Sequence, residues 1–177
     1  MSTIQSLGVV GAGIMGGGIA QVFAAAGLEV TLIDLHQAAL EKGLQSIANS
    51  LDRLVKKEKI TPQDKFDTLA RIKQSTSYSD LKDLPLVIEA ATENKELKEK
   101  IIKLISDVVS PNTIIASNTS SLSVTELAAL DQHPERVIGM HFFNPPPLMA
   151  LVEIIRGLQT SDATHETIYK LAKQIGK

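Results

Sequence analysis

The sequence predicts an α/β fold, with a mostly parallel sheet that carries helices on both faces. Short apolar runs, which are typical of buried strands, alternate along the chain with longer amphipathic segments, which are typical of helices. This alternation indicates βαβ units, in which each helix crosses one face of the sheet. With 177 residues, 44% of them hydrophobic, the chain is long enough to bury a sizeable core, and we expect residues 1–177 to form one domain.

A glycine pattern follows the first predicted strand, an apolar run that ends at residue 10. Gly11, Gly13 and Gly16 have the spacing G-x-G-x-x-G. In such a turn the first glycine permits a tight bend, the second lets a pyrophosphate approach the backbone, and the third lets the next helix pack on the strand. The pattern predicts a Rossmann-type site for a dinucleotide.

The helix and strand after this turn agree with that prediction. Ile14 and Met15 open a helix of residues 14–26, whose free N–H groups and positive dipole end favour phosphate, so both are candidates for cofactor binding. Asp34 ends a second apolar run, at about the spacing expected for a carboxylate that binds a ribose hydroxyl. Because this carboxylate would repel a 2′-phosphate, the sequence favours NAD over NADP.

Two plainer interpretations of the stretch remain open. One is a glycine-rich contact between a helix and a strand that binds no ligand. The other is a membrane span, because residues 6–28 carry no charge. Six glycines between positions 8 and 18, and the change of period from strand to helix, argue against a span.

An inserted helical hairpin is predicted over about residues 36–70. One apolar stripe runs along a first helix of residues 37–59, formed by Leu40, Leu44, Ile47, Leu51 and Leu54. Thr61 and Pro62 then mark the start of a second helix. Lysines at the end of the first helix form either a solvated face or an anchor for an anionic substrate. Ser50 and Lys57, one of these lysines, are seven residues apart and therefore share one face of this helix.

The rest of the chain continues the alternation of strands and helices. We expect strands at 71–76, 86–91, 113–116, 137–140 and 151–155, and helices at 93–109, 124–130 and 162–175. In the helix of 93–109 the residues predicted to point inward are Leu97, Ile101, Leu104, Ile105 and Val108.

Polar residues follow several of these strands, where ligands bind in open parallel sheets. His141 follows the strand of 137–140 and is the natural general base, because histidine exchanges a proton near neutral pH. Glu153, in the next strand, is placed to face it and hold the ring in one tautomer. Plainer roles remain open: a hydrogen-bonded structural histidine, a surface glutamate and, for Ser120, a turn or cap.

Composition excludes other classes of function. A net charge of −2 and 3% aromatic residues give no reason to expect nucleic acid as a partner. The absence of cysteine excludes disulfides and thiolate chemistry, and no metal-ligand spacing appears. No secretory signal is apparent at the start of the chain, and we expect a cytoplasmic protein without a membrane partner.

Longer motifs carry a resemblance to a known family. They are Gly11–Gly16, Ile88–Glu93, Ala116–Leu122, Val137–Pro145 and Leu151–Arg156. Together they resemble the NAD-binding domain of L-3-hydroxyacyl-CoA dehydrogenases, and in particular the short 3-hydroxybutyryl-CoA dehydrogenases. The resemblance covers essentially the whole chain, and it implies reversible, NAD-dependent oxidation of (S)-3-hydroxyacyl-CoA to 3-oxoacyl-CoA.

The resemblance also implies roles for single residues. His141 becomes the catalytic base, Glu153 its carboxylate partner, and Ser120 the residue that hydrogen-bonds the substrate oxygen. Besides Asp34 and the glycine turn, the residues implied at the cofactor are Glu93, Lys98, Ser120 and Asn144. Ser50 and Lys57 match positions that contact coenzyme A in the family.

The same family continues into an all-helical C-terminal domain that closes the cleft, mediates dimerisation and supplies a catalytic asparagine. That domain is absent from this chain, which ends at Lys177. We expect the domain in cis or in trans, and full activity to depend on it. The alternative is a non-catalytic NAD-binding module of the same fold.

Overall fold

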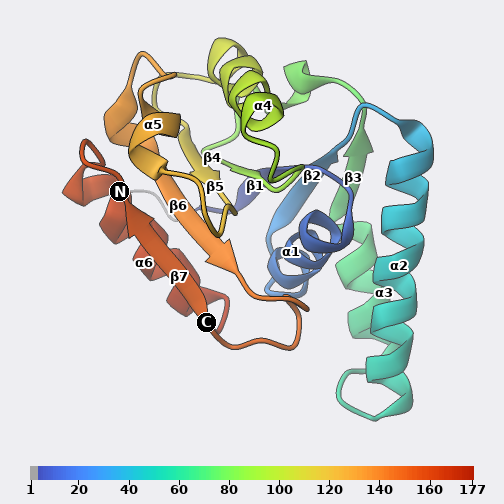
Figure 1. Ribbon diagram of the computed structural model, residues 1–177. Coiled ribbons are helices and arrows are strands. Elements are labelled where there is room, and N and C mark those ends of the chain that lie inside the picture. The colour runs from blue at the N-terminus through green and yellow to red at the C-terminus, as the bar shows by residue number, and fades with distance from the viewer. Residues whose placement is uncertain (1–3) are drawn as a thin grey trace.

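A computed structural model describes residues 4–177 of the protein. Within them, seven strands form one sheet in the order β3-β2-β1-β4-β5-β6-β7 (Figure 1). The strands are β1 (Ser6–Val10), β2 (Glu29–Ile33), β3 (Ile72–Ser75), β4 (Leu86–Glu89), β5 (Ile114–Ser117), β6 (Val137–Phe142) and β7 (Val152–Arg156). The helices are α1 (Ile14–Ala25), α2 (Gln37–Lys56), α3 (Pro62–Ala70), α4 (Lys95–Val108), α5 (Val124–Ala128) and α6 (Asp162–Gln174), with 3₁₀ turns η1 (Tyr78–Leu81) and η2 (Pro134–Arg136).

The predicted fold class is confirmed. The first six strands, β1 through β6, all run parallel to one another, and helices cover both faces of the sheet. The strand order reverses between β1 and β4, because β2 and β3 lie on one side of β1 and β4 on the other. Such a switch point opens a crevice at the carboxyl ends of the two strands, and the glycine turn lies there.

The predicted βαβ alternation is wrong for the last connection. The loop between β6 and β7 contains no helix, and β7 runs antiparallel to β6. Pro145, Pro146 and Pro147 stand in this loop, and prolines do not continue a helix. A link this short also cannot cross the sheet to begin a parallel strand. In addition, β6 extends to Phe142, so that His141 lies inside the strand and not after it.

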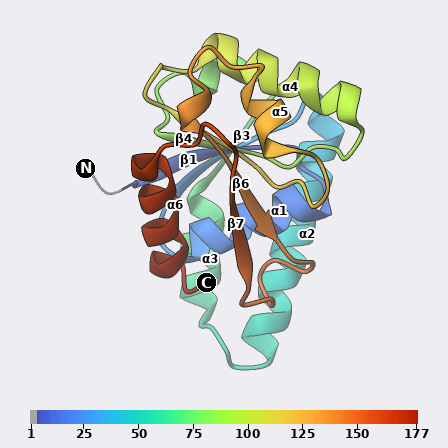
Figure 2. The ribbon, with the colours of Figure 1, turned by 60° about the vertical axis from the view of Figure 1, so that its left-hand side comes forward.

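Two apolar clusters lie on opposite faces of the sheet. The larger one joins the sheet to α1, α2 and α6, with Phe23, Leu51 and Ile168 among its buried members. The other joins it to α4 and α5 through residues such as Ile102 and Leu127. Figure 2 shows α4 and α5 above the sheet and the remaining helices below it.

The glycine turn is fixed by close contacts. Gly11 has a φ of 103°, in the left-handed region that favours glycine, and its N–H donates to the Ile33 carbonyl at 2.7 Å. A Cβ on Gly16 would collide with the carbonyl oxygen of Gly11. The predicted roles of these two glycines in the turn and in helix packing are therefore confirmed, and the stretch folds as strand, turn and helix, not as a membrane span. Within residues 4–177 no helix is both long and apolar enough to cross a membrane.

The predicted helical hairpin is formed by α2 and α3, which project beyond the sheet (Figure 1). A Cβ on Gly43 would lie 2.7 Å from the Ala12 carbonyl, so this glycine lets α2 approach the glycine turn closely. Thr61 caps α3 as predicted, in a reciprocal capping box with Asp64. The hairpin thus forms a wall beside the turn.

The predicted inward face of α4 is partly wrong. Leu97 and Leu104 are 49% and 48% exposed, whereas Lys98 and Ile102 are buried. The helix is rotated about its axis relative to the prediction, because the ammonium group of Lys98 has a buried carboxylate partner, Glu89. An apolar stripe alone does not reveal such a pair.

Candidate active site

A cleft of about 520 Å³ lies at the switch point. The glycine turn forms its floor, and Asp34 and Ala91 lie at the ends of the neighbouring strands. One face of α2 and the prolines of the β6–β7 loop also line it. The cleft therefore combines the predicted glycine turn with two walls that the glycine pattern does not indicate.

The start of α1 fits a phosphate group. Its N-cap residue, Gly13, gives no side-chain hydrogen bond to the first turn, and that turn carries no acidic residue. A Cβ on Gly13 would meet no protein atom within 4 Å, so the space above the turn is open. Ile14 is 77% exposed beside it and Met15 is half-buried. Free N–H groups and the positive helix end are thus presented to the cleft.

Asp34 lies where the sequence places it, just after β2. Its carboxylate accepts hydrogen bonds from the N–H groups of Ala12 at 3.0 Å and of His36 at 3.1 Å. The side chain lines the cleft and retains lone pairs for a further donor such as a ribose hydroxyl. The dinucleotide site therefore has both of its predicted parts in one cleft.

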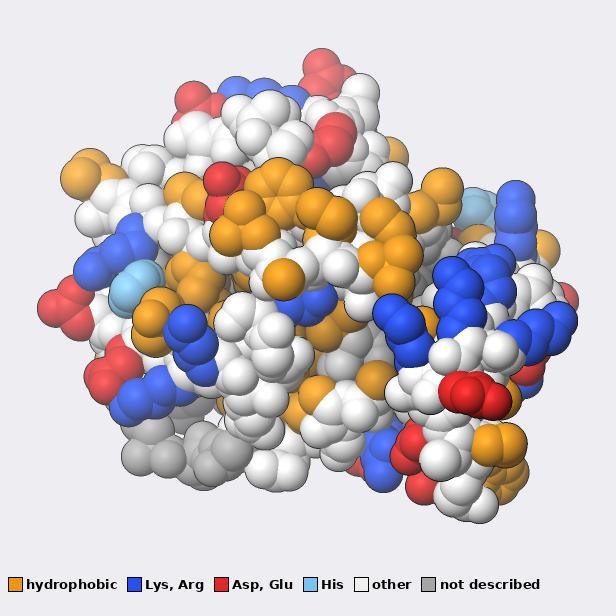
Figure 3. Space-filling model, turned by 90° about the horizontal axis from the view of Figure 1, so that it is seen from below, with side chains coloured by type: hydrophobic (Ala, Val, Ile, Leu, Met, Phe, Trp, Pro, Cys, Tyr) orange, Lys and Arg blue, Asp and Glu red, His pale blue; other side chains and the backbone are white. Residues whose placement is uncertain are grey.

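The face of α2 that lines the cleft carries polar and basic side chains. Of these, only Ser50 was predicted as a site residue from the sequence. Lys42, Ser46 and Arg53 line the cleft beside Ser50, and were missed. Their spacing of four, four and three residues on one helix would have revealed this face. Lys57 is exposed and forms the C-cap of α2, outside the residues that line the cleft. Figure 3 shows lysine and arginine side chains gathered over the side of the molecule that the hairpin forms.

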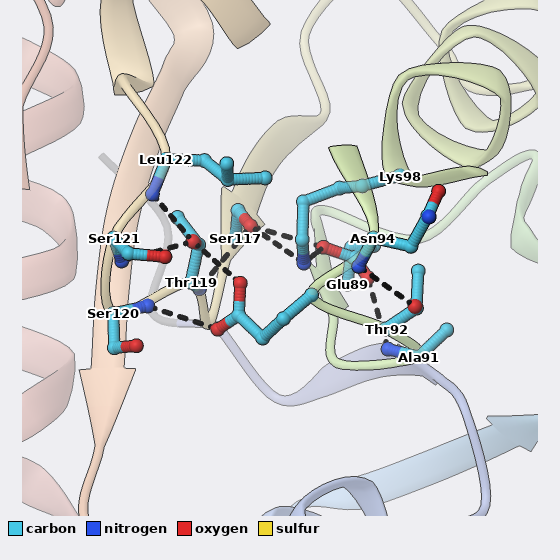
Figure 4. A network of polar contacts seen from close by, with 11 residues as sticks. Glu89, Ala91, Thr92, Asn94, Lys98, Ser117, Thr119, Ser120, Ser121 and Leu122 are labelled. Carbon is cyan, nitrogen blue, oxygen red and sulfur yellow. Dashed lines mark hydrogen bonds and ion pairs between the residues drawn. The ribbon is translucent and has the colours of Figure 1, made fainter. Parts of the chain in front are cut away.

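The loops after β4 and β5 are tied together by Glu93. Its carboxylate accepts from the Thr119 hydroxyl at 2.9 Å and from the Ser120 N–H at 3.0 Å. Figure 4 shows the Ser120 side chain pointing away from this network, so its hydroxyl is free of the network's contacts. Two candidates from different loops, Glu93 and Ser120, are thus brought together.

Lys98 is buried, whereas Glu93, Ser120 and Asn144 are exposed. It is 1% exposed, and its ammonium group pairs with Glu89 and lies 3.4 Å from the Ser117 hydroxyl. Like Glu93, Ser120 and Asn144, it is not among the residues that line the cleft. Lys98 is thus buried beneath the loops after β4 and β5, and its place at the cofactor stays a prediction.

His141 and Glu153 face each other across the β6–β7 pair, in direct register. The Nδ1 atom of His141 lies 2.8 Å from a carboxylate oxygen of Glu153. An ionised carboxylate only accepts, so Nδ1 carries the hydrogen and Nε2 keeps its lone pair. The His141 side chain is 16% exposed, and its ring lies 4.6 Å from that of Phe143. The pair is an oriented imidazole with one nitrogen available to accept a proton.

The loop after β6 joins this pair to the cleft. Asn144 is exposed at the start of the loop. A Cβ on Gly18 would lie 2.8 Å from Pro146, which places the loop directly against α1. Lys177 donates to the carbonyls of Pro146 at 2.8 Å and Met149 at 2.5 Å, and burial lowers the pKa of its ammonium group. The chain between β6 and β7 therefore forms the rim of the cleft.

Comparison with known proteins decides the family. Residues 6–177 match the family described as "3-hydroxyacyl-CoA dehydrogenase, NAD binding domain". The chain belongs to this family. The resemblance found in the sequence motifs is therefore confirmed. As a separate finding, within residues 4–177 no group of three or more histidine, aspartate or glutamate side chains is arranged to hold a metal ion.

Individual relatives agree with this assignment. A 3-hydroxybutyryl-CoA dehydrogenase of Clostridioides difficile is 44% identical over 173 residues, which are 98% of this chain and 62% of the relative. The fatty acid oxidation complex subunit alpha of Acinetobacter baylyi is 44% identical over 174 residues, 98% of this chain but 24% of that subunit. The solved structure of (S)-3-hydroxybutyryl-CoA dehydrogenase from Ralstonia eutropha has a TM-score of 0.97 and 60% identity, covering 99% of this chain and 62% of its own. The chain thus spans less than two thirds of these relatives.

Proposed function

We propose that the protein oxidises (S)-3-hydroxyacyl-CoA to 3-oxoacyl-CoA with NAD, or runs the reverse reduction of a substrate such as acetoacetyl-CoA. The observation that carries the proposal is the His141–Glu153 pair, which stands on β6 and β7, the two strands that the loop at the rim of the cleft connects. The dehydrogenase names of the relatives support the substrate class.

The chain's own residues account for the proton transfer. NAD, when bound on the glycine turn, supplies the acceptor for the hydride from C3 of the substrate. His141 takes the proton of the 3-hydroxyl group on Nε2, because hydride leaves readily only from a carbon whose oxygen is becoming an alkoxide. Glu153 stabilises the imidazolium that results and keeps the ring in the required tautomer. In the reverse direction the same imidazolium returns the proton.

Other predicted residues position the two ligands. We assign Ser120 to the substrate oxygen through its free hydroxyl, and Asn144 to the region where nicotinamide and substrate meet. Ser50 and Lys57 hold the coenzyme A end through the polar face of the hairpin. Binding energy from this remote end helps to place the reacting carbon.

The proposal includes a second domain. The relatives are longer than this chain, and the fatty acid oxidation subunits are much longer. We propose that residues 1–177 form the cofactor domain, and that a helical domain, in cis or in trans, completes the acyl pocket and forms a dimer. A cytoplasmic location suits such an enzyme.

The test is acetoacetyl-CoA-dependent NADH oxidation by the chain, alone and with a helical C-terminal partner. His141→Ala should lower turnover by about 10³-fold or more, as expected for loss of a general base together with its orientation, while the NADH Kd changes by less than about twofold. His133→Ala is the matched control, because His133 also stands beside a glutamate, Glu135 at 3.6 Å, but at the opposite end of β6.

Equal loss of turnover in both variants would contradict the proposal, as would parallel loss of turnover and NADH affinity in His141→Ala. NADH binding without turnover in any combination of domains would instead favour a non-catalytic module of the same fold.

A further inference from the structure

A glutamine on α1 is buried without a hydrogen-bond partner. Gln21 is 3% exposed, yet within residues 4–177 no donor or acceptor meets its side-chain amide. Every side-chain nitrogen or oxygen that is fully enclosed in this part of the chain does have a partner. The amide of Gln21 is therefore not sealed inside the core, and it must face an open space.

Two hollows meet at this glutamine. One is the cleft at the switch point, which Gln21 lines together with Gly17, four residues earlier on the same face of α1. The other has a volume of about 750 Å³ and lies between α1, the hairpin and the end of α6. Gln21 and Pro147 line both of them. The Gln21 amide thus stands where the cleft continues past the loop between β6 and β7.

An amide in this position does not serve the fold alone. A buried polar group that has lost its water and gained no partner destabilises the folded state, and an apolar side chain of the same shape avoids that cost. A ligand that brings a donor and an acceptor to the amide offsets the cost. The unpartnered amide therefore points to a binding role.

The walls beside the amide favour an uncharged segment of a ligand. One turn before Gln21, α1 carries Gly17 and Gly18, which have no side chains. Pro146 packs on Gly18, and Pro147 follows it in the loop between β6 and β7. The lysine and the arginine that line the cleft belong to α2 instead. An apolar segment that carries an amide group suits these walls better than a phosphate does.

We propose that Gln21 hydrogen-bonds an amide group in the pantetheine arm of the acyl-CoA substrate. The inference deepens the proposed function and rests on it. A secondary amide donates and accepts at once, as the glutamine amide does, whereas an ionised phosphate only accepts. The pantetheine arm carries two such amides between apolar carbons. It must lead from Ser50 in the hairpin to the thioester beside His141, and the cleft at Gln21 lies between α2 and the loop that follows β6.

The test compares two probes by calorimetric titration of the chain. Acetoacetyl-CoA contains the pantetheine arm, and adenosine 3′,5′-bisphosphate is the nucleotide end of coenzyme A without that arm. Gln21→Met removes the amide and nearly keeps the length and volume of the side chain. We expect this variant to bind acetoacetyl-CoA about tenfold more weakly than the parent, or about 1.4 kcal/mol, with the Kd for the bisphosphate and for NADH within about twofold.

The same variant separates a binding role from a structural one. Because the amide has no partner within residues 4–177, its removal should leave the Tm unchanged or raise it. A glutamine that served only the fold would instead lower the Tm when replaced. Gln21→Leu is a second variant without the amide, and we expect the same selective loss from it.

Gln174→Met is the matched control. Gln174 is an exposed residue of α6 that lines the second hollow but not the cleft. The same chemical change at this position should leave all three dissociation constants within about twofold.

Three results would overturn the inference. They are parent-like affinity of Gln21→Met and Gln21→Leu for acetoacetyl-CoA, equal weakening of acetoacetyl-CoA and the bisphosphate, or the same selective loss in Gln174→Met. Failure of the parent to bind acetoacetyl-CoA, both alone and with the helical partner of the turnover assay, would overturn the proposed function itself. This result is distinguishable because it needs no variant.

Discussion

The glycines of the turn after β1 differ in what surrounds them. Gly11 and Gly16 face protein atoms: Ala91 in one case and the Gly11 carbonyl in the other. Gly13 faces open space in the cleft. The first two therefore determine the shape of the turn, whereas Gly13 determines how closely a ligand approaches it.

This difference predicts opposite results for two similar substitutions. Gly13→Ala should leave the Tm nearly unchanged, because the new methyl group meets no protein atom and Gly13 already has a φ of −71°. It should weaken NADH binding about tenfold, or about 1.4 kcal/mol, because the methyl group enters the space of the pyrophosphate. Gly16→Ala should lower the Tm, because its methyl group collides with the backbone. Thermal melts and NADH titrations of both variants check this.

A lower Tm in Gly13→Ala with parent-like NADH affinity would contradict the assignment of the open space to a phosphate.

His141 and Glu153 illustrate what single residues reveal in advance. Their types indicated an acid–base pair, and the structure brings them to 2.8 Å. Their register comes from an antiparallel pairing that the proline-containing loop produces, and a prediction of parallel strands throughout does not contain it. The contact was therefore predicted correctly from chemistry, but with the wrong strand direction.

At the scale of elements, strongly periodic segments were predictable and buried polar groups were not. The strands and helices lie close to their predicted ranges, since apolar period and capping residues are local signals. The rotation of α4 was missed because Lys98 is buried through a partner, Glu89, in another element. The polar stripe of α2 was a local signal that went unused.

The cap of α3 gives a pH-dependent prediction. Hydrogen bonds from the backbone N–H of Thr61 at 2.8 Å and from its hydroxyl at 2.7 Å hold the pKa of Asp64 below its usual value of 3.8. The folded state therefore binds a proton on Asp64 more weakly than the unfolded chain does. Because of this difference, the contribution of the Asp64 carboxylate to stability is fully present above the usual pKa of 3.8. It is lost as the pH falls through the lower pKa of the folded state.

We therefore expect Asp64→Ala to have a lower Tm than the parent at about pH 6, with a difference that shrinks below about pH 3.8. Melting curves across this range measure it, and Asp83→Ala, an exposed carboxylate before β4, is the control. A Tm difference for Asp64→Ala that stays constant down to about pH 2 would show that the carboxylate charge does not contribute.

At the scale of the whole molecule, the order of the strands determines where the candidate site lies. The switch between β1 and β4 brings the glycine turn, the loop after β4 and the loop after β5 to one crevice. Local patterns predicted an α/β sheet but not this order, because strand order arises from contacts between distant segments. The glycine pattern predicted a Rossmann-type site, which the structure confirms, whereas the strand order was not predicted and comes from the structure alone.

The most direct test of the account is a titration of the chain with NADH and, separately, with NADPH, followed by the fluorescence of the nicotinamide. The protein contains no tryptophan, so its own emission interferes little. We predict saturable binding of NADH and at least about tenfold weaker binding of NADPH, because the Asp34 carboxylate repels the 2′-phosphate by about 1.4 kcal/mol or more. The absence of saturable NADH binding, or equal affinity for the two cofactors, would contradict the account.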